Sequence, residues 1–167
     1  MKRTIIHLCF LFAALHATAQ TSVRWMPYVQ QNGMYFSSDH VTSAGAGMGL
    51  GLAVGVGNHF LAQTDVNIYW INGNAVSTRW AAGYKRSGTW APAILGNVSL
   101  LWGGRTEVLL EDGQRPVSPV AVLGLRIAGL RFENDKGFVS ALELGFGFGP
   151  YQGTCPELSL LSVGIRM

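Results

Sequence analysis

The sequence predicts an all-β fold: an antiparallel up-and-down transmembrane β-barrel, most simply one of eight strands. Three observations predict it. Apolar side chains alternate with glycine from Gly45 to Gly57. Alternating segments of roughly ten residues or slightly more recur along the chain between turn residues, as in membrane barrels. The composition is 49% hydrophobic and only 13% charged, with 22 glycines. Alternation in a strand gives one apolar face, which suits lipid outside and a crowded lumen inside.

The first 20 residues have the parts of a secretory signal peptide. Lys2 and Arg3 form a positive start, residues 5–15 are apolar, and Ala17-Thr18-Ala19 offers small residues before a cut near Gln20. The apolar run is shorter than the ~20 residues that a membrane-spanning helix needs. The expected domains are therefore a signal peptide, 1–20, and a single β-barrel domain, 21–167.

Eight segments fit the strand pattern, and their connections alternate in length. The strands are expected at 24–37, 45–57, 60–71, 76–85, 90–102, 119–132, 138–149 and 158–167. The connections 58–59, 86–89 and 133–137 are short, whereas 38–44, 72–74, 103–118 and 150–157 include the longer ones. Both termini of an even-stranded barrel lie on the periplasmic side, so the short turns are predicted there and the longer loops outside.

Alternation also predicts which side chains face lipid. On the second strand these are Met48, Leu50, Leu52, Val54 and Val56, with the glycines inward. The third to sixth strands continue the pattern with outward Val66, Ile68, Thr78, Trp80, Ala82, Tyr84, Ile94, Val98, Leu123, Leu125 and Ile127. The seventh is expected to point Phe138, Ser140, Leu142, Leu144, Phe146 and Phe148 outward, and Val139, Ala141, Glu143, Gly145, Gly147 and Gly149 inward. The last points Leu161, Val163, Ile165 and Met167 outward.

The polar residues of these strands fall on the inner face. They predict a structural network that fills a lumen too narrow for an open pore, made of Asp65, Arg79, Lys85, Asn97, Arg126, Glu143 and Arg166. The alternative is a site or gate in which Glu143 and Asp65 pair with Arg126 and Arg79. An aromatic girdle at the membrane boundaries is expected from Trp70, Trp80, Trp90 and Trp102.

From the signal peptide to the last strand, the chain resembles the small eight-stranded outer-membrane β-barrel proteins of Gram-negative bacteria. Its Ala17-Thr18-Ala19-Gln20 ending is similar to the signals of Bacteroidetes. The resemblance implies an outer-membrane location, with outer-membrane lipid, periplasmic chaperones and the barrel-insertion machinery as partners. Such proteins usually end on Phe or Trp, whereas this chain ends on Arg166-Met167.

No catalytic, cofactor-binding or metal-binding residues are predicted, so the chain is not expected to be an enzyme. After the signal its histidines are His40 and His59, and neither has the His-x-Ser arrangement of the lipid A deacylase barrels. The glycine-rich segment 45–57 precedes no helix, which argues against a phosphate-binding loop. Basic residues form no cluster or stripe, which argues against a nucleic-acid partner.

These observations favour a structural or surface-interaction barrel with a side-chain-filled lumen. Its external loops, above all 103–118, would hold a surface partner. The alternative is a soluble exported barrel of lipocalin or avidin type that binds an apolar ligand, with Met48, Leu50, Leu52, Phe146 and Phe148 inside. A lipid-modifying barrel enzyme is the third hypothesis, with His40 as its only candidate loop residue.

Overall fold

The computed structural model describes residues 22–37, 42–70, 75–103, 119–149 and 153–167. The strands are β1 (Val23–Ser37), β2 (Thr42–Val56), β3 (Phe60–Tyr69), β4 (Ala75–Lys85), β5 (Ala93–Gly103), β6 (Val120–Ala128), β7 (Leu130–Asn134), β8 (Gly137–Phe148) and β9 (Thr154–Ile165). Within these ranges, no helix is long and apolar enough to cross a membrane. The predicted signal peptide and His40 lie outside the described residues.

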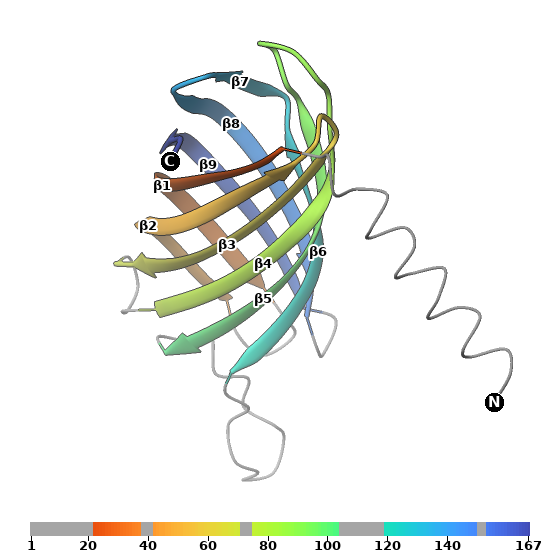
Figure 1. Ribbon diagram of the computed structural model, residues 1–167. Coiled ribbons are helices and arrows are strands. Elements are labelled where there is room, and N and C mark those ends of the chain that lie inside the picture. The colour runs from red at the N-terminus through yellow and green to blue at the C-terminus, as the bar shows by residue number, and fades with distance from the viewer. Residues whose placement is uncertain (1–21, 38–41, 71–74, 104–118, 150–152) are drawn as a thin grey trace, which may run out of the picture.

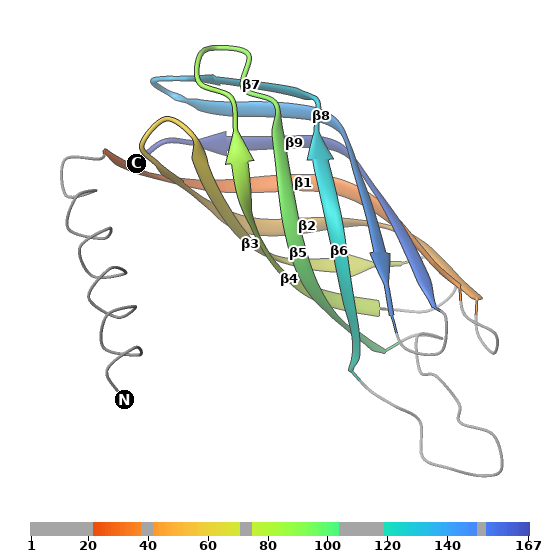
Figure 2. The ribbon, with the colours of Figure 1, turned by 90° about the vertical axis from the view of Figure 1, so that its right-hand side faces the viewer.

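The strands form one closed antiparallel barrel (Figure 1). Neighbours in sequence pair from β1 to β6, β1 also pairs with β9, and β9 pairs with β8. Closure comes from β8, which pairs with both β6 and β7. Because β6 and β7 are consecutive halves of one strand interrupted at Gly129, the described strands make an eight-stranded barrel, as the sequence predicted. The strands are steeply tilted (Figure 2).

The outside of the barrel is apolar, and the buried charged and amide side chains lie inside it. Leu50 on β2 is 68% exposed, whereas the Arg126 side chain on β6 is 4% exposed. Met48, Phe146 and Phe148 are exposed with Leu50, and Leu52 is half-exposed. This placement is the opposite of what a soluble barrel with an apolar ligand inside requires, so that alternative is wrong about these residues.

The inward glycines of β2 make room for side chains from the adjacent strands. A Cβ on Gly49 would overlap the Asn67 side-chain amide, and one on Gly51 would overlap the Tyr28 ring. These neighbours come from β3 and β1, which flank β2. The alternating glycines therefore belong to the packing of the lumen.

A line of irregular backbone crosses three adjacent strands. Leu142 on β8 lies opposite the break at Gly129 and opposite Leu160 on β9 in the pairing registers. Leu142 has a φ of 51°, and the register between β1 and β9 shifts by one residue beside Leu160. At such a bulge one extra residue reverses the facing of the side chains beyond it.

This bulge overturns the facing predicted for the start of the seventh strand. Phe138 and Ser140 are buried inside the barrel, whereas Val139 is exposed and Ala141 half-exposed. Beyond Leu142 the prediction holds, since Glu143 is buried and Leu144 exposed.

Several strand limits also differ from those predicted. β2 begins at Thr42 and β9 at Thr154, so parts of the predicted connections 38–44 and 150–157 are strand. β5 begins at Ala93, although Trp90 forms an isolated bridge with Phe132. The short turns nevertheless gather at one end, where Met167 N donates to Trp25 O (Figure 1).

The lumen is filled in layers, which follow in order along β1. Arg24 lies at the short-turn end, then Met26 in an apolar layer, then Gln30 among polar groups, and then Phe36 in a second apolar layer. The first apolar layer also contains Leu61, Leu95 and Phe138, and the second Tyr69, Leu101 and Val122. Two polar regions thus lie at different depths, separated by an apolar layer.

Candidate functional site

The deeper polar region, here called the central cluster, is built around Arg79 of β4. It comprises Tyr28, Gln30, Asn32, Asp65, Asn67, Ser77, Arg79, Arg126, Glu143 and Glu157. Arg79 donates to Asp65 Oδ2 from Nε at 3.1 Å and Nη2 at 2.7 Å, and from Nη1 to Glu157 Oε2 at 2.6 Å. Asp65 lies opposite Arg79 in the β3–β4 register, whereas Glu157 is on β9, so this guanidinium spans the lumen.

Asn67 connects the central cluster to β1. Its Oδ1 accepts from Gln30 Nε2 and Asn32 Nδ2, each at 2.6 Å. Its Nδ2 donates to Asp65 Oδ1 at 2.6 Å and to Ser77 Oγ at 3.2 Å. One amide therefore uses both ends to join three strands, an arrangement that alternation of polar residues on β1, β3 and β4 produces directly.

A second arginine closes the cluster on its other side. Arg126 of β6 pairs with Glu143 of β8, and its Nη2 donates to Gln30 Oε1 at 3.2 Å. Gln30 Oε1 also accepts from Arg79 at 3.3 Å, so this oxygen links the two guanidiniums. Buried charges are tolerated when they are paired and hydrogen-bonded in this way. Apolar layers above and below complete a plug of packed side chains.

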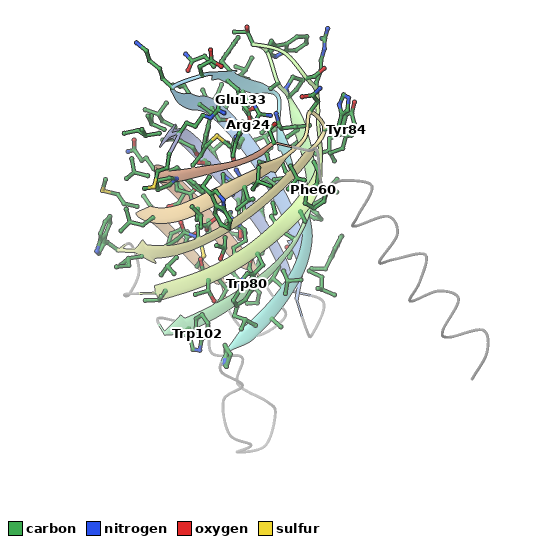
Figure 3. All side chains as sticks on the ribbon, viewed as in Figure 1. Arg24, Phe60, Trp80, Tyr84, Trp102 and Glu133 are labelled. Atoms are coloured by element: carbon green, nitrogen blue, oxygen red, sulfur yellow. The ribbon has the colours of Figure 1, made fainter. Side chains whose placement is uncertain are left out.

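The shallower polar region, here called the rim cluster, consists of Arg24, Lys85, Arg131 and Glu133. Lys85 Nζ is 2.6 Å from Glu133 Oε2, and Arg131 Nε donates to Glu133 Oε1 at 2.9 Å. Arg24 Nη1 lies 3.9 Å from Glu133 Oε2. The Arg131 guanidinium also stacks on Phe138, 3.8 Å from the ring centre. Three cations therefore share one carboxylate, and Figure 3 shows Arg24 and Glu133 near the short-turn end.

The structure brings most of the predicted lumen residues together, but in two groups rather than one. Asp65, Arg79, Arg126 and Glu143 lie in the central cluster, and Lys85 in the rim cluster. Asn97 is half-buried, and its Nδ2 lies 3.4 Å from Ser99 Oγ.

Arg166 does not belong to either cluster, contrary to the prediction that it is part of the lumen network. It follows the end of β9, its side chain is 35% exposed, and it lies 3.7 Å from the exposed Asp135. Arg166 lies beyond Ile165, the last residue of β9, at the short-turn end of the barrel, where its side chain contacts solvent.

The tryptophans do not all lie at the barrel ends. Trp70 and Trp102 lie at or beside strand ends away from the short turns, and Trp90 lies at the short-turn end. Trp80 is paired with Thr64 and Val98 in the middle of their strands, and Figure 3 shows it between the ends. A girdle position for Trp80 is therefore wrong, because twofold alternation fixes the face of a residue but not its height.

Four charged residues of the two clusters were not among the predicted site residues: Arg24, Arg131, Glu133 and Glu157. Glu133 and Glu157 were assigned to connections that are partly strand. Arg131 would point outward if the alternation of 123–127 continued, but the break at Gly129 turns it inward. The one available signal was charge balance, because buried basic residues need carboxylate partners.

His59 lies in a short turn, where its ring stacks on Tyr84 with centroids 5.3 Å apart. Among the residues that the structure describes, no three His, Cys, Asp or Glu side chains are grouped to hold a metal ion.

Comparison with known proteins identifies the fold. No family model and no curated protein matches the chain. Solved structures do match. Neisserial surface protein A (NspA) aligns at 12% identity over 87% of this chain and 99% of that protein, with a TM-score of 0.66. Ail, the attachment invasion locus protein of Yersinia pestis, solved with the heparin analogue sucrose octasulfate, aligns at 9% identity over 87% and 99%, with a TM-score of 0.50. At such identities the likeness shows the closed eight-stranded barrel fold, which confirms the predicted architecture.

Proposed function

We propose that this chain is an outer-membrane β-barrel protein of a Gram-negative bacterium with a structural or surface-interaction role. In this proposal residues 1–20 direct export, the barrel crosses the outer membrane, and its lumen is plugged rather than open. Its partners are outer-membrane lipid, periplasmic chaperones and the barrel-insertion machinery during assembly, and a surface partner that binds the external loops.

The observation that carries the proposal is the contrast between the two faces of the sheet. Large apolar side chains cover the outside on every strand, whereas the inside holds ion pairs and amide hydrogen bonds. Monomeric soluble proteins rarely expose contiguous apolar patches above a few hundred Å². A membrane barrel instead needs an apolar band facing lipid and a closed sheet without free edges.

The filled lumen favours a structural or binding role over a wide pore. Arg79 and Arg126 reach partners on other strands through the barrel interior, and apolar layers flank them on both sides. Eight-stranded barrels have an interior just wide enough for side chains to fill.

The strand connections support a surface role. β5 ends and β6 begins at the end of the barrel opposite the short turns, and 104–118, the longest stretch between two strands, separates them in the sequence and lies outside the described residues. Loops on a rigid scaffold often carry binding residues. The similar structures belong to proteins named for the cell surface and for attachment, which supports the same kind of role.

Fractionation of cells that express the full chain tests the proposal. We expect the protein in the outer-membrane fraction, resistant to extraction with urea, released by detergent, and with a gel mobility that changes on boiling. A known periplasmic protein serves as the control for leakage between fractions. Recovery of the folded chain in a detergent-free periplasmic fraction would contradict the proposal.

A further inference from the structure

The barrel mouth at the short-turn end contains a polar pocket of about 300 Å³. Arg24, Lys85 and Glu133 of the rim cluster lie at its wall. Three short turns complete the lining with Asn58, Ser87, Gly88, Thr89, Asn134 and Asp135. Its volume is at the lower end of the range of about 300–1,000 Å³ for small-molecule sites. The pocket is therefore large enough for a small ion with a short substituent.

The charged side chains that line this pocket, Arg24, Lys85, Glu133 and Asp135, balance in number but differ in their exposure to solvent. Glu133 is the carboxylate of the rim cluster, and it is shared by Lys85, Arg131 and more distantly Arg24. The carboxylate of Asp135 also lines the pocket, but its side chain is fully exposed to solvent, which screens it. The buried groups thus carry an excess of positive charge beside an open pocket, which favours an anion.

Arg24 is the cation best placed to meet a ligand. Its Nη2 donates to Gly57 O at 2.9 Å, which orients the side chain. Its Nε has no hydrogen-bond partner among the described residues, and the side chain is 20% exposed, against 2% for Lys85. The Arg24 guanidinium is therefore more accessible to a ligand in the pocket than the Lys85 ammonium is.

The donors approach the pocket from several directions. Arg24 comes from β1 and Lys85 from β4, while the Ser87 and Thr89 hydroxyls and the Asn58 and Asn134 amides come from three turns. A planar carboxylate suits a single two-pronged donor. A phosphate group offers several oxygens around one centre, and both Arg and Lys bind it.

We propose that the pocket at the short-turn end binds an oxyanion of the phosphate class, held by Arg24 and Lys85. The occupant is either a soluble phosphate or phosphomonoester or the phosphate of a lipid headgroup. This proposal does not depend on a surface-interaction role for the opposite end of the barrel.

Titration of the refolded full-length barrel in a phosphate-free maltoside detergent with inorganic phosphate tests the site. Amide NMR signals of residues 86–89 and 133–135 should shift in a saturable manner at constant ionic strength. Arg24→Gln should weaken phosphate binding by about tenfold or more, the effect of losing one charge-assisted hydrogen bond. Lys136→Gln is the matched control, because Lys136 is an exposed cation in the same turn as Asp135 but does not line the pocket.

Glu133→Gln gives a test of opposite sign. Removal of the shared carboxylate takes a negative charge from the pocket wall and frees Lys85 for the anion, so phosphate should bind more tightly and should raise the unfolding temperature of this variant more than that of the natural chain. Absence of saturable shifts in the natural chain, or equal weakening by Arg24→Gln and Lys136→Gln, would overturn the proposal.

The source of the phosphate is separated by repeating the titration in lipid nanodiscs. If the phosphate-induced shifts disappear in phosphatidylglycerol discs but persist in uncharged glycolipid discs, the lipid headgroup occupies the site. If they persist in both, the occupant is a soluble phosphate. Each of these results supports an oxyanion site.

Discussion

The central cluster and the rim cluster use buried charge in different ways. In the central cluster, Arg79 and Arg126 meet three carboxylates, and apolar layers enclose them on both sides. In the rim cluster, Arg24, Lys85 and Arg131 share Glu133 beside an open pocket. In the first arrangement carboxylates outnumber the cations, although Arg126 Nη1 has no hydrogen-bond partner among the described residues, whereas in the second the cations outnumber the carboxylate.

This difference indicates a division of roles along the barrel axis. Enclosed, paired charges fill the lumen and hold opposite strands together. The cations of the rim cluster, which outnumber their carboxylate at the barrel mouth, are suited to bind an anion from outside. Substitutions in the two clusters should therefore change the stability of the barrel by different amounts.

Arg79→Met should cause the largest loss of stability. It leaves Asp65 and Glu157 without their guanidinium partner inside the barrel, and breaking a buried ion pair costs about 3–5 kcal/mol. The free energy of unfolding in urea, measured in detergent micelles or lipid vesicles, checks this. Arg86→Met, at an exposed position directly after the end of β4, is the control and should change little. If the free energy of unfolding falls no more than in the control, the ion pairs of Arg79 do not stabilise the packed lumen.

Two inward glycines of β2 give a matched comparison. Gly49→Ala forces a methyl group into the Asn67 amide of the central cluster, and such overpacking costs about 1–3 kcal/mol. Gly55→Ala has Arg24 Nε at 3.7 Å as its nearest atom, which is ordinary contact. It should therefore cost nothing, and it could gain up to about 1 kcal/mol because alanine restricts the unfolded chain. Equal effects on the unfolding free energy would show that the two regions are packed alike.

Lys85→Met should cost less than Arg79→Met, although both cations are buried on β4. Glu133 keeps Arg131 at 2.9 Å after the change, so no carboxylate is left unpaired. The expected loss is about 1.5 kcal/mol, typical of one hydrogen bond to a charged group. Urea unfolding under the same conditions measures it. A loss of stability equal to that of Arg79→Met would contradict the proposal that the rim cluster has more cations than it needs to pair Glu133.

Much of the fold follows from period-two alternation in the sequence. Leu50, Leu123 and Val66 face outward as their spacing predicts, and Asp65 and Arg79 face inward on paired strands. Alternation predicts the facing of these residues because a one-residue slip in register would move the apolar side chains of a strand into the lumen and its polar side chains to the outside.

Local irregularities limited what the sequence could predict about the interior. The bulge line at Gly129, Leu142 and Leu160 reverses the facing of Phe138 and of Arg131 without an unusual residue at Leu142. The alternation on either side of a bulge is intact, so the pattern alone does not locate the shift. Pairing across strands decides it, and this information appears only when β6 to β9 are assembled.

The most direct test of the central claim, an apolar barrel surface that faces lipid around a polar plug, uses tryptophan fluorescence. Trp80 lies at mid-strand and Trp90 at the short-turn end, and both are exposed on the outside. In chains that retain only one of these tryptophans, the others being changed to Phe, lipids brominated near the middle of their acyl chains should quench Trp80 more than Trp90. Equal quenching of the two, or no quenching of Trp80, would contradict the account.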